Sequence, residues 1–368
     1  MGLSQRFMIK GVEKKKVAAV VLSILFIIGL SGCASSSGLV PAAPGKGKKR
    51  IISIATVQPE DHPISIGLKA FQDYIQKELG EEFEIKIYFN GIMGDNGQAL
   101  ELLQMGTLDL VATSGSNLES FDDTYKIFGL PYLFEDEEHF RTCMKDDEFV
   151  TTIYDCTVRK GIQGVAWFAN GVNNIYSSKP IRTPDDIKGI KLRIQSSEAN
   201  VKMAQQFGAA AVVMAYGEVY TAMQNHVIDA AMNPEMALIS MKHGEVAKYY
   251  SRTEHQIFTD VMVANVDFMN SLDDQEKKVM EEGFRLCTDV EVKEWDRQIV
   301  DCIKEAEAMG VEFIEVDKTP FEELQKPVRE ELLKSYPQLQ PLHQRILEIQ
   351  EKQENQEIQQ IQEKGEQE

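Results

Sequence analysis

The chain lacks the residue patterns on which enzymes and metal sites are commonly built. Its 368 residues contain no GxSxG, HExxH or Walker motif, and no GxGxxG follows a predicted strand. The six histidines are dispersed, and His226, His243 and His255 do not fall at helical intervals. The five cysteines include no CxxC pair and no Cys/His spacing suited to a metal. We therefore expect no enzymatic activity, no metal and no cofactor.

Positive charge is also scarce. Lys and Arg number 39 against 58 Asp and Glu, which gives a formal net charge of −19. This argues against nucleic acid as a partner, because such binding needs a basic face. A small anionic ligand is not excluded, since charges beyond about 8 Å are largely screened at physiological salt.

Long apolar runs are limited to one near the N-terminus. Val17–Leu30 is apolar over 14 residues, whereas a membrane span needs about 20. It follows several lysines and precedes Leu30-Ser31-Gly32-Cys33, which matches a lipobox. We expect residues 1–32 to be a signal peptide and Cys33 to carry lipid, with 33–50 as a flexible tether. The protein would then be exported and anchored to the outer face of the cytoplasmic membrane. An uncleaved anchor helix is the alternative.

The remaining four cysteines allow two interpretations. Cys287 and Cys302 are predicted to share one helix, where their separation of roughly 22 Å forbids a disulfide. Cys143 and Cys156 lie in consecutive helical segments and could be bonded in an exported protein. The alternative is that all four are core cysteines.

The folded part alternates strands with helices, which predicts an α/β fold with a mostly parallel sheet covered on both faces. About 290 residues between tether and tail suit two domains. The last predicted strand is long enough to pass from one domain to the other. The strands are expected at 49–56, 83–89, 109–113, 164–170, 191–194, 210–215, 229–233 and 255–268.

The longest predicted element follows Ser271, which forms a plausible capping box with Asp274, and stops at Gly310. A helix of about 38 residues would span some 57 Å and could lie across both domains. Two helices with a break near 288–289 are the alternative. From residue 345 onward Gln and Glu predominate. This tail is expected to be a frayed helix or disordered and to bury no core, a coiled coil being the sharper alternative.

One charged residue lies at a position that is predicted to be buried, where a charge is costly. Arg193 is the one charge inside a strand, KLRI, that should be buried on both faces, since Lys191 stands at its outer end. Its planar guanidinium could hold an anionic ligand. An internal salt bridge is the equally open alternative.

The segment around this arginine, KPIRTPDDIKGIKLR, is followed by MAYGEVYTAMQ and by Ile228-Asp229 and Asn233-Pro234. With these motifs the chain resembles the solute-binding proteins of TRAP (tripartite ATP-independent periplasmic) transporters, and the likeness covers roughly residues 51–340. Further motifs in the family's order are His62-Pro63, Phe89–Asn96, Gln104–Asp109 and Leu130–Phe134.

The resemblance implies a two-domain periplasmic-binding-protein fold with crossing strands and a long helix spanning both domains. Domain I would comprise 51–170 and about 259–298, domain II 171–258 and about 299–344, and 345–368 the polar tail. Such a protein captures an organic acid in an interdomain cleft and delivers it to membrane permease subunits. The alternative is a ligand-sensing lipoprotein on the same scaffold, and an exported hydrolase is more distant.

The resemblance also implies binding residues. Arg193 would take the ligand carboxylate, Asn233 would hydrogen-bond the same end, and Tyr216 would pack on the ligand's apolar face. Tyr216 could instead be a core aromatic, and Asn233 a helix cap. Weaker candidates follow the ends of strands: Thr56, Gln58, Thr113 and Ser114.

One position departs from the family. Many relatives carry a second arginine where this chain has Asn173. An asparagine offers hydrogen bonds but no charge. We therefore expect a ligand with one carboxylate and several hydroxyls, such as a sugar acid or hydroxy acid, with Asn173 and Asn233 matching the hydroxyls.

Overall fold

The computed structural model describes residues 49–365. The predicted signal peptide, the predicted lipid-bearing Cys33 and the tether up to residue 48 lie outside the described residues, as does 366–368. No helix in the described part combines the length and the apolar character needed to cross a membrane.

The strands agree with prediction apart from their ends. β8 begins before its predicted start at 255, β4 extends beyond 164–170 at both ends, and β9 was not predicted. The strands are β1 (Arg50–Thr56), β2 (Phe83–Tyr88), β3 (Leu110–Ser114), β4 (Ile162–Ser177), β5 (Lys191–Ile194), β6 (Ala210–Val213), β7 (Ala230–Asn233), β8 (Tyr249–Asn265) and β9 (Glu312–Glu315).

Helices connect these strands and cover them. The α-helices are α1 (Pro63–Leu79), α2 (Asn96–Gln104), α3 (Gly115–Leu118), α4 (Glu137–Cys143), α5 (Asp147–Asp155), α6 (Glu198–Gln206), α7 (Val219–Gln224), α8 (Met236–Ser240), α9 (His243–Val246), α10 (Val266–Asn270), α11 (Asp274–Ala308), α12 (Thr319–Ser335) and α13 (Leu339–Gly365). Four 3-10 helices are η1 (Asp123–Gly129), η2 (Val158–Lys160), η3 (Pro184–Ile187) and η4 (Tyr216–Glu218).

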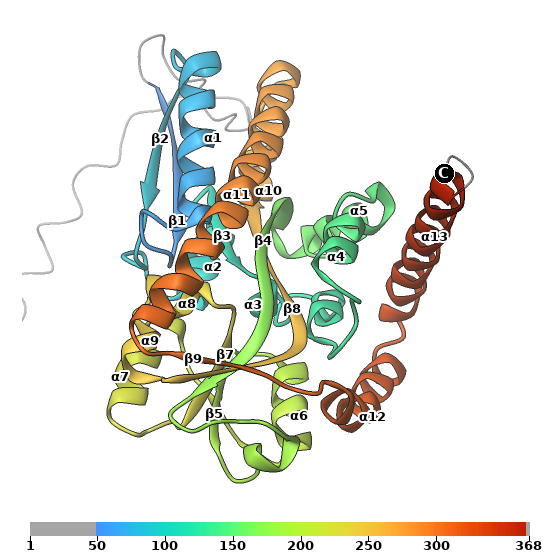
Figure 1. Cartoon of the computed structure of the whole chain (residues 1–368). Coiled ribbons are helices and arrows are strands. Elements are labelled where there is room, and N and C mark those ends of the chain that lie inside the picture. The colour runs from blue at the N-terminus through green and yellow to red at the C-terminus, as the bar shows by residue number, and fades with distance from the viewer. Residues whose placement is uncertain (1–48, 366–368) are drawn as a thin grey trace, which may run out of the picture. The chain divides into compact units, whose positions relative to one another are not determined.

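The described strands form one mixed sheet in the order β2-β1-β3-β8-β4-β7-β5-β6, with β9 paired to β8. At one end β1 runs parallel to β2 and β3, and at the other β5 runs parallel to β6 and β7. The long strands β4 and β8 pair antiparallel with each other along the middle (Figure 1). They pass through both halves, as expected for the crossing strands of a two-domain fold.

Helices α1 and α11 pack together against the first half of the sheet (Figure 1). The rings of Phe71 and Phe284 stack there with centroids 5.2 Å apart. Gly67 permits this close approach, because a Cβ at that position would lie 2.7 Å from the carbonyl oxygen of Cys287. The two helices are thereby fixed against each other and against the sheet.

The prediction of a single long helix is confirmed, since α11 is continuous over 35 residues, and the alternative with a break near 288–289 is not found. The predicted capping box at Ser271 and Asp274 is wrong by two positions. The side chain of Asp273 accepts from the backbone of Glu276, and the Glu276 side chain accepts from the backbone N–H of Asp273. Ser271 instead donates to a carbonyl of α10.

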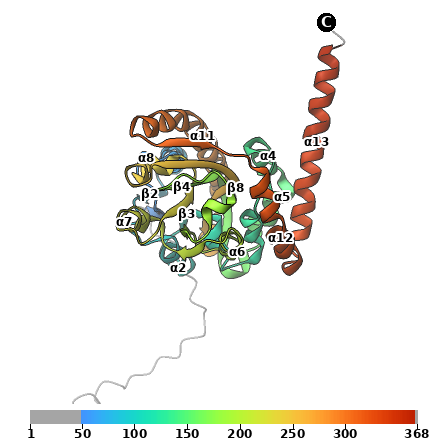
Figure 2. The same cartoon turned by 60° about the horizontal axis from the view of Figure 1, so that its bottom comes forward.

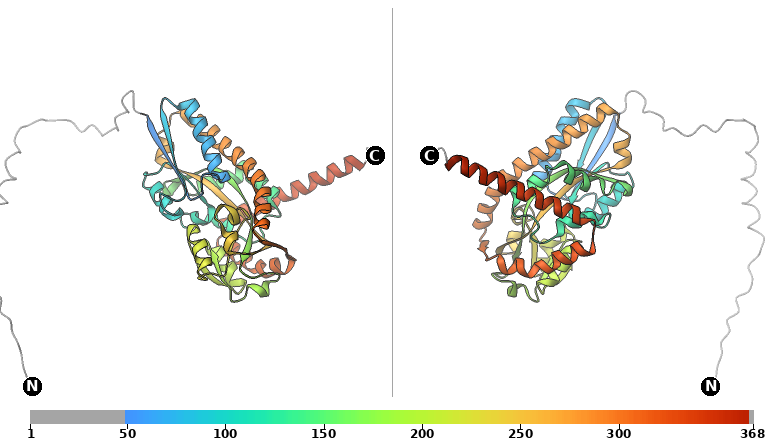
Figure 3. Two further views of the ribbon diagram at one scale, coloured as in Figure 1. Left: turned by 60° about the vertical axis from the view of Figure 1, so that its left-hand side comes forward. Right: turned by 90° about the vertical axis from the view of Figure 1, so that its right-hand side faces the viewer.

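The predicted polar tail needs a correction. Residues from 345 onward continue a regular helix, α13, and its first half buries Ile346 and Ile349 in the core. Arg345 bonds Asp146 with both arms of its guanidinium. Figure 2 shows α13 beside α4 and α5 over this half, and in Figure 3 its far end stands away from them. The tail therefore contributes Ile346 and Ile349 to the core.

The described cysteines are all free. Cys143, Cys287 and Cys302 are buried and Cys156 is half-buried. This agrees with the core-cysteine interpretation and not with a bond between Cys143 and Cys156.

Candidate functional site

A cavity of about 880 Å³ opens between the two halves of the sheet. It is lined by the ends of β1, β3, β5 and β6, by the loop 90–98 and by the segment 213–218. Ligands of open α/β sheets bind at such carboxyl ends of strands. Six of the predicted binding residues line this cavity: Gln58, Thr113, Ser114, Arg193, Tyr216 and Asn233.

Arg193 reaches the cavity from the middle of β5, which lies between β6 and β7. Its side chain is 2% exposed, and Nε and Nη2 donate to the carbonyl of Met214 at 3.0 and 2.8 Å. Its guanidinium lies 5.9 Å from the ring of Tyr216. Nη1 is buried without a partner. Burial lowers the pKa of Arg193, because removing a cation from water disfavours the charged form.

The internal salt bridge considered for Arg193 is not found. No carboxylate of residues 49–365 lies within ion-pair distance of its guanidinium. The two bonds to one carbonyl fix the orientation of the side chain and leave one nitrogen free for another acceptor. Such a group can bind a ligand carboxylate by charge-assisted hydrogen bonds.

Asn233 and Tyr216 form a second wall in the same half. The amide of Asn233 donates to the hydroxyl of Tyr176 at 2.8 Å, and that hydroxyl lies 2.7 Å from His243 Nδ1. Tyr216 meets the His243 ring edge to face at 5.7 Å. Burial lowers the pKa of His243 to about 3. The cap of α8 is Glu235, so Asn233 is not the helix cap that was considered.

The opposite wall belongs to the first half of the sheet. Ser114 lies directly across from Asp260 of β8, and the hydroxyls of Ser114 and Ser116 are 3.1 Å apart. Asp260 is 5% exposed, and its Oδ1 has no partner. Burial raises the pKa of Asp260 to about 7, against the lowering effect of hydrogen bonds from Asn170 and Ser114. The Oε1 atom of Gln58 is likewise buried and unpaired.

Two predicted residues do not line the cavity. The hydroxyl of Thr56 accepts from the backbone N–H of Gln58 at 3.2 Å and so helps to place that residue. Asn173 is 1% exposed, and its amide donates to Gln256 at 3.0 Å within the sheet. A ligand contact by Asn173 stays a prediction.

Asn170 lines the cavity because of an irregularity in β4. The pairing register with β8 shifts between Ala169 and Val172. Gly171 within this shift has φ of +66°, and a Cβ there would lie 2.6 Å from the Trp295 ring. The bulge turns Asn170 toward Asp260. Bulges commonly re-aim a side chain in this way.

Sequence reasoning missed Asp260 and Asn170. Asp260 carried a usable signal, since it is the only charged residue among 256–265, much as Arg193 lies inside a short strand that is otherwise apolar after Lys191. Asn170 carried none, because its position depends on the bulge. No group of His, Cys, Asp and Glu among the described residues is arranged to hold a metal ion.

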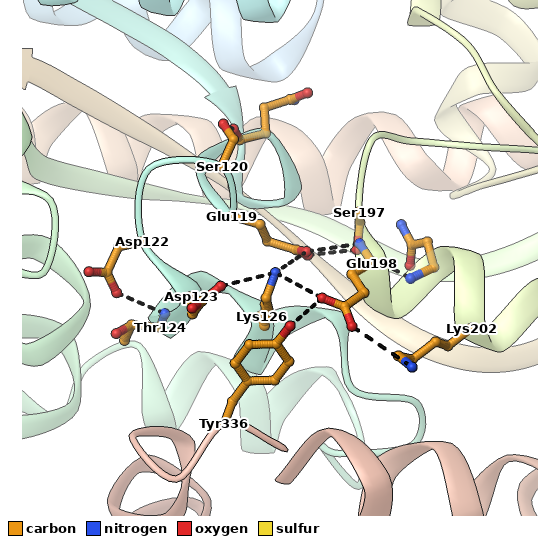
Figure 4. Close-up of polar contacts among 12 residues, drawn as sticks. Glu119, Ser120, Asp122, Asp123, Thr124, Lys126, Ser197, Glu198, Lys202 and Tyr336 are labelled. Atoms are coloured by element: carbon orange, nitrogen blue, oxygen red, sulfur yellow. Dashed lines mark hydrogen bonds and ion pairs between the residues drawn. The ribbon is translucent and has the colours of Figure 1, made fainter. Parts of the chain in front are cut away.

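An ionic network with a buried centre, formed by Glu119 and Lys126, adjoins the cavity (Figure 4). Glu119 accepts from the Ser197 hydroxyl at 2.6 Å and from the backbone N–H of Glu198 at 3.2 Å. Lys126 lies 3.7 Å from Glu119 and 3.5 Å from Glu198. Tyr336 donates to Glu198. The network therefore joins η1 to the start of α6 and to the end of α12.

The comparisons with known proteins agree with this architecture. Residues 54–338 match the family model described as bacterial extracellular solute-binding protein, family 7. The chain belongs to this family. The match ends just before α13, which begins at Leu339.

Solved TRAP periplasmic solute-binding proteins have the same fold. One from Anaerococcus prevotii, with bound α/β-D-glucuronate, is 37% identical, covers 83% of this chain and 99% of its own, and has a TM-score of 0.82. One from Bradyrhizobium sp., with α/β-D-galacturonate, is 30% identical, covers 81% and 99%, and has a TM-score of 0.78. The C4-dicarboxylate-binding periplasmic protein of Rhodobacter capsulatus is 27% identical over 83% of this chain and 93% of its own. The resemblance to TRAP solute-binding proteins is confirmed.

Proposed function

We propose that this family member is the receptor of a TRAP transporter for a sugar acid of the hexuronate class. The observation that carries the proposal is Arg193, a buried guanidinium at the cavity with Nη1 unpaired and no carboxylate within reach among the described residues. A buried cation without a counter-ion is costly. A ligand carboxylate supplies the missing charge and accepts from Nη1.

The rest of the cavity supports a sugar rather than a simple acid. Its volume of about 880 Å³ lies within the range of roughly 300–1,000 Å³ usual for small-molecule sites. Asn233 and Tyr216 lie on the same side as Arg193, where an amide meets the carboxylate end and a ring packs on the apolar face of the pyranose. Two solved relatives hold glucuronate and galacturonate.

We also propose how the two domains move and where the protein is held. Domain I (51–170 and about 259–298) and domain II (171–258 and about 299–344) would close on the ligand about β4 and β8. The protein would be held by lipid on Cys33 at the outer face of the cytoplasmic membrane and would pass its ligand to membrane permease subunits. It would bind without turning the ligand over.

Native mass spectrometry of freshly purified protein, followed by denaturation and identification of the released compound, tests the ligand class. We expect a monocarboxylate with several hydroxyls. A thermal-shift panel of D-glucuronate, D-galacturonate, succinate and malate gives a second readout. If succinate or malate stabilised the protein most and the uronates had no effect, the proposal would be wrong.

A further inference from the structure

The cavity has a chemical polarity that its lining residues create. At the wall formed by β5 the unpaired buried atom is Nη1 of Arg193, which is a donor and carries positive charge. At the wall formed by β1, β3 and β8 the unpaired buried atoms include Oε1 of Gln58 and Oδ1 of Asp260, which are acceptors. An acceptor can be satisfied only by a donor. The two walls therefore require different groups on one ligand.

Asp260 is the stronger of the two acceptors. It stands in the middle of the sheet, paired with Ser114 on one side and with Phe168 on the other, so its backbone has little freedom to move. Asn170 and Ser114, which also line the cavity, lie near enough to lower the pKa of this carboxyl group against the larger effect of burial. No base of the described residues forms an ion pair with it. Its Oδ1 atom remains without a donor, and a buried unpaired acceptor costs about 1–3 kcal/mol.

We propose that Asp260 is the residue that reads the hydroxyl groups of the ligand and rejects a second carboxylate. This rests on the proposed function, in which Arg193 takes the one carboxylate at the opposite wall. A ligand hydroxyl donates to Oδ1 of Asp260, which then has a partner. A C4-dicarboxylate brings a second anion to the wall of Asp260, where it meets the carboxyl group of Asp260 and Oε1 of Gln58.

The inference explains selectivity without a second arginine. Where the family commonly carries one, this chain has Asn173, which bonds Gln256 inside the sheet and does not line the cavity. The discriminating group is instead an acid on the other domain. It acts by repulsion of the wrong ligand as well as by attraction of the right one, which is how specific sites commonly discriminate.

The test compares Asp260→Asn with wild type by calorimetric titration with D-glucuronate, D-galacturonate and succinate at about pH 8, where the carboxyl group of Asp260, whose pKa burial raises to about 7, is ionised. The amide keeps the shape and one acceptor but loses the charge. Hydrogen bonds to charged groups are stronger than neutral ones by about 1 kcal/mol, so uronate affinity should fall about five- to tenfold. Succinate affinity should rise, because the like charge is gone. The ratio of uronate to succinate affinity should therefore fall at least tenfold.

The matched control is Asp109→Asn. Asp109 is also a partly buried acid beside the first half of the sheet, but it accepts from the backbone N–H of Ser53 at 2.7 Å and does not line the cavity. Its variant should leave the uronate-to-succinate ratio within twofold of wild type. A second arm uses unaltered protein and tetrahydropyran-2-carboxylate, which keeps the ring and carboxylate but has no hydroxyls. It should bind at least a hundredfold more weakly than D-glucuronate.

The outcomes separate the two proposals. If wild type binds a uronate and Asp260→Asn leaves the ratio unchanged, or the ring acid without hydroxyls binds as well as D-glucuronate, the role of Asp260 is wrong and the proposed function stands. If wild type prefers succinate over every uronate, both are wrong. A crystal structure of the complex should place a sugar hydroxyl on Asp260, and a carboxylate there would also overturn the inference.

Discussion

Two buried charged clusters lie on adjoining stretches of this chain and differ in how fully their polar atoms are paired. In the network of Figure 4, Lys126 is surrounded by Glu119, Asp123 and Glu198, and Glu119 accepts from two further donors. At the cavity, Arg193 and Asp260 each keep a buried atom without a partner. Ser120 and Ser196 line the cavity next to residues of the network.

The contrast separates a structural role from a binding role. Buried charges whose partners are all present hold elements together. Removing one partner leaves the others buried without a counter-charge, which is costly. Buried charges with missing partners are costly in the empty protein and become favourable when a ligand completes them. Unpaired buried polar groups of this kind often mark functional sites. We therefore expect substitutions in the two clusters to have opposite consequences.

The largest expected effect is on ligand binding by Arg193→Ala. Removing one partner of a buried charge pair costs about 3–5 kcal/mol, which raises the dissociation constant by about two to three and a half decades. Arg193→Lys keeps the charge but loses the planar fork and should also weaken binding markedly. The free energy of unfolding without ligand should change far less, because the lost packing and the lost hydrogen bonds to Met214 are offset by removal of a buried charge without a counter-ion. Calorimetry and denaturant titration measure the two quantities.

The control for Arg193 is Arg252→Lys. Arg252 already pairs with Glu235 at 3.0 Å and with Glu315 at 3.0 Å, and it does not line the cavity. Its variant should bind the ligand within threefold of wild type. An Arg193→Ala protein that folds normally and binds within that same margin would refute the anchoring role.

A substitution in the network of Figure 4 should lower the stability and leave ligand selectivity unchanged. Lys126→Met removes the cation from a site where its side chain is 8% exposed and leaves Glu119, at 4%, without a counter-charge. The free energy of unfolding should fall by about 3 kcal/mol, while ligand selectivity should be unchanged. Lys304→Met is the control, since its pair with Asp301 is 70% exposed on both sides and exposed pairs contribute about 0–1 kcal/mol. Equal losses for both variants would contradict the comparison.

A pH titration sharpens the comparison. Burial raises the pKa of Glu119 from its ordinary value of 4.5 to about 7. The folded protein therefore holds this proton at pH values where the unfolded chain has lost it. The stability that this proton confers is complete below about pH 4.5 and is lost as the pH rises through about 7, by at most about 1.4 kcal/mol per pH unit.

The variant Glu119→Gln should flatten the stability profile between these pH values without changing the uronate-to-succinate ratio. Asp260→Asn should also flatten it, because burial raises the pKa of Asp260 to about 7, but it should change the ratio. Urea denaturation at half-unit steps of pH measures the slope. A Glu119→Gln protein with the wild-type slope would show that Glu119 is ionised throughout this range.

Much of the fold and part of the site followed from local signals. Arg193 was found because a lone charge in an apolar strand is costly, and the cavity contains it. The long helix was found from its apolar spacing, although its cap is Asp273 and not Ser271. The ends of strands led to Gln58 and Ser114 by the rule that parallel strands bind ligands at their carboxyl ends.

The rest depends on contacts between distant segments. Asn170 enters the cavity through a bulge in which Gly171 makes room for Trp295 of α11. No residue near Gly171 in the sequence indicates the contact with Trp295. Ile346 looked isolated among Gln and Glu, yet its side chain is buried in the hydrophobic cluster that includes Phe140 and Cys143 of α4. Periodicity reports the face of a helix, and it does not report which surface will cover that face.

The smallest predicted effect concerns Ser197, which serves the network and the helix at once. Its hydroxyl oxygen accepts from the backbone N–H of Asn200 as the N-cap of α6, and its hydroxyl donates to Glu119. Ser197→Ala should lower the free energy of unfolding by about 1 kcal/mol, less than Lys126→Met, because Glu119 keeps Lys126 and the N–H of Glu198.

Thr152→Ala is the control, since that exposed hydroxyl only donates to the carbonyl of Glu148 within its own helix. Thermal unfolding measures both, and ligand affinity should stay within twofold. If Ser197→Ala weakened uronate binding as strongly as Asp260→Asn, the network would belong to the binding site and the division between the two clusters would fail.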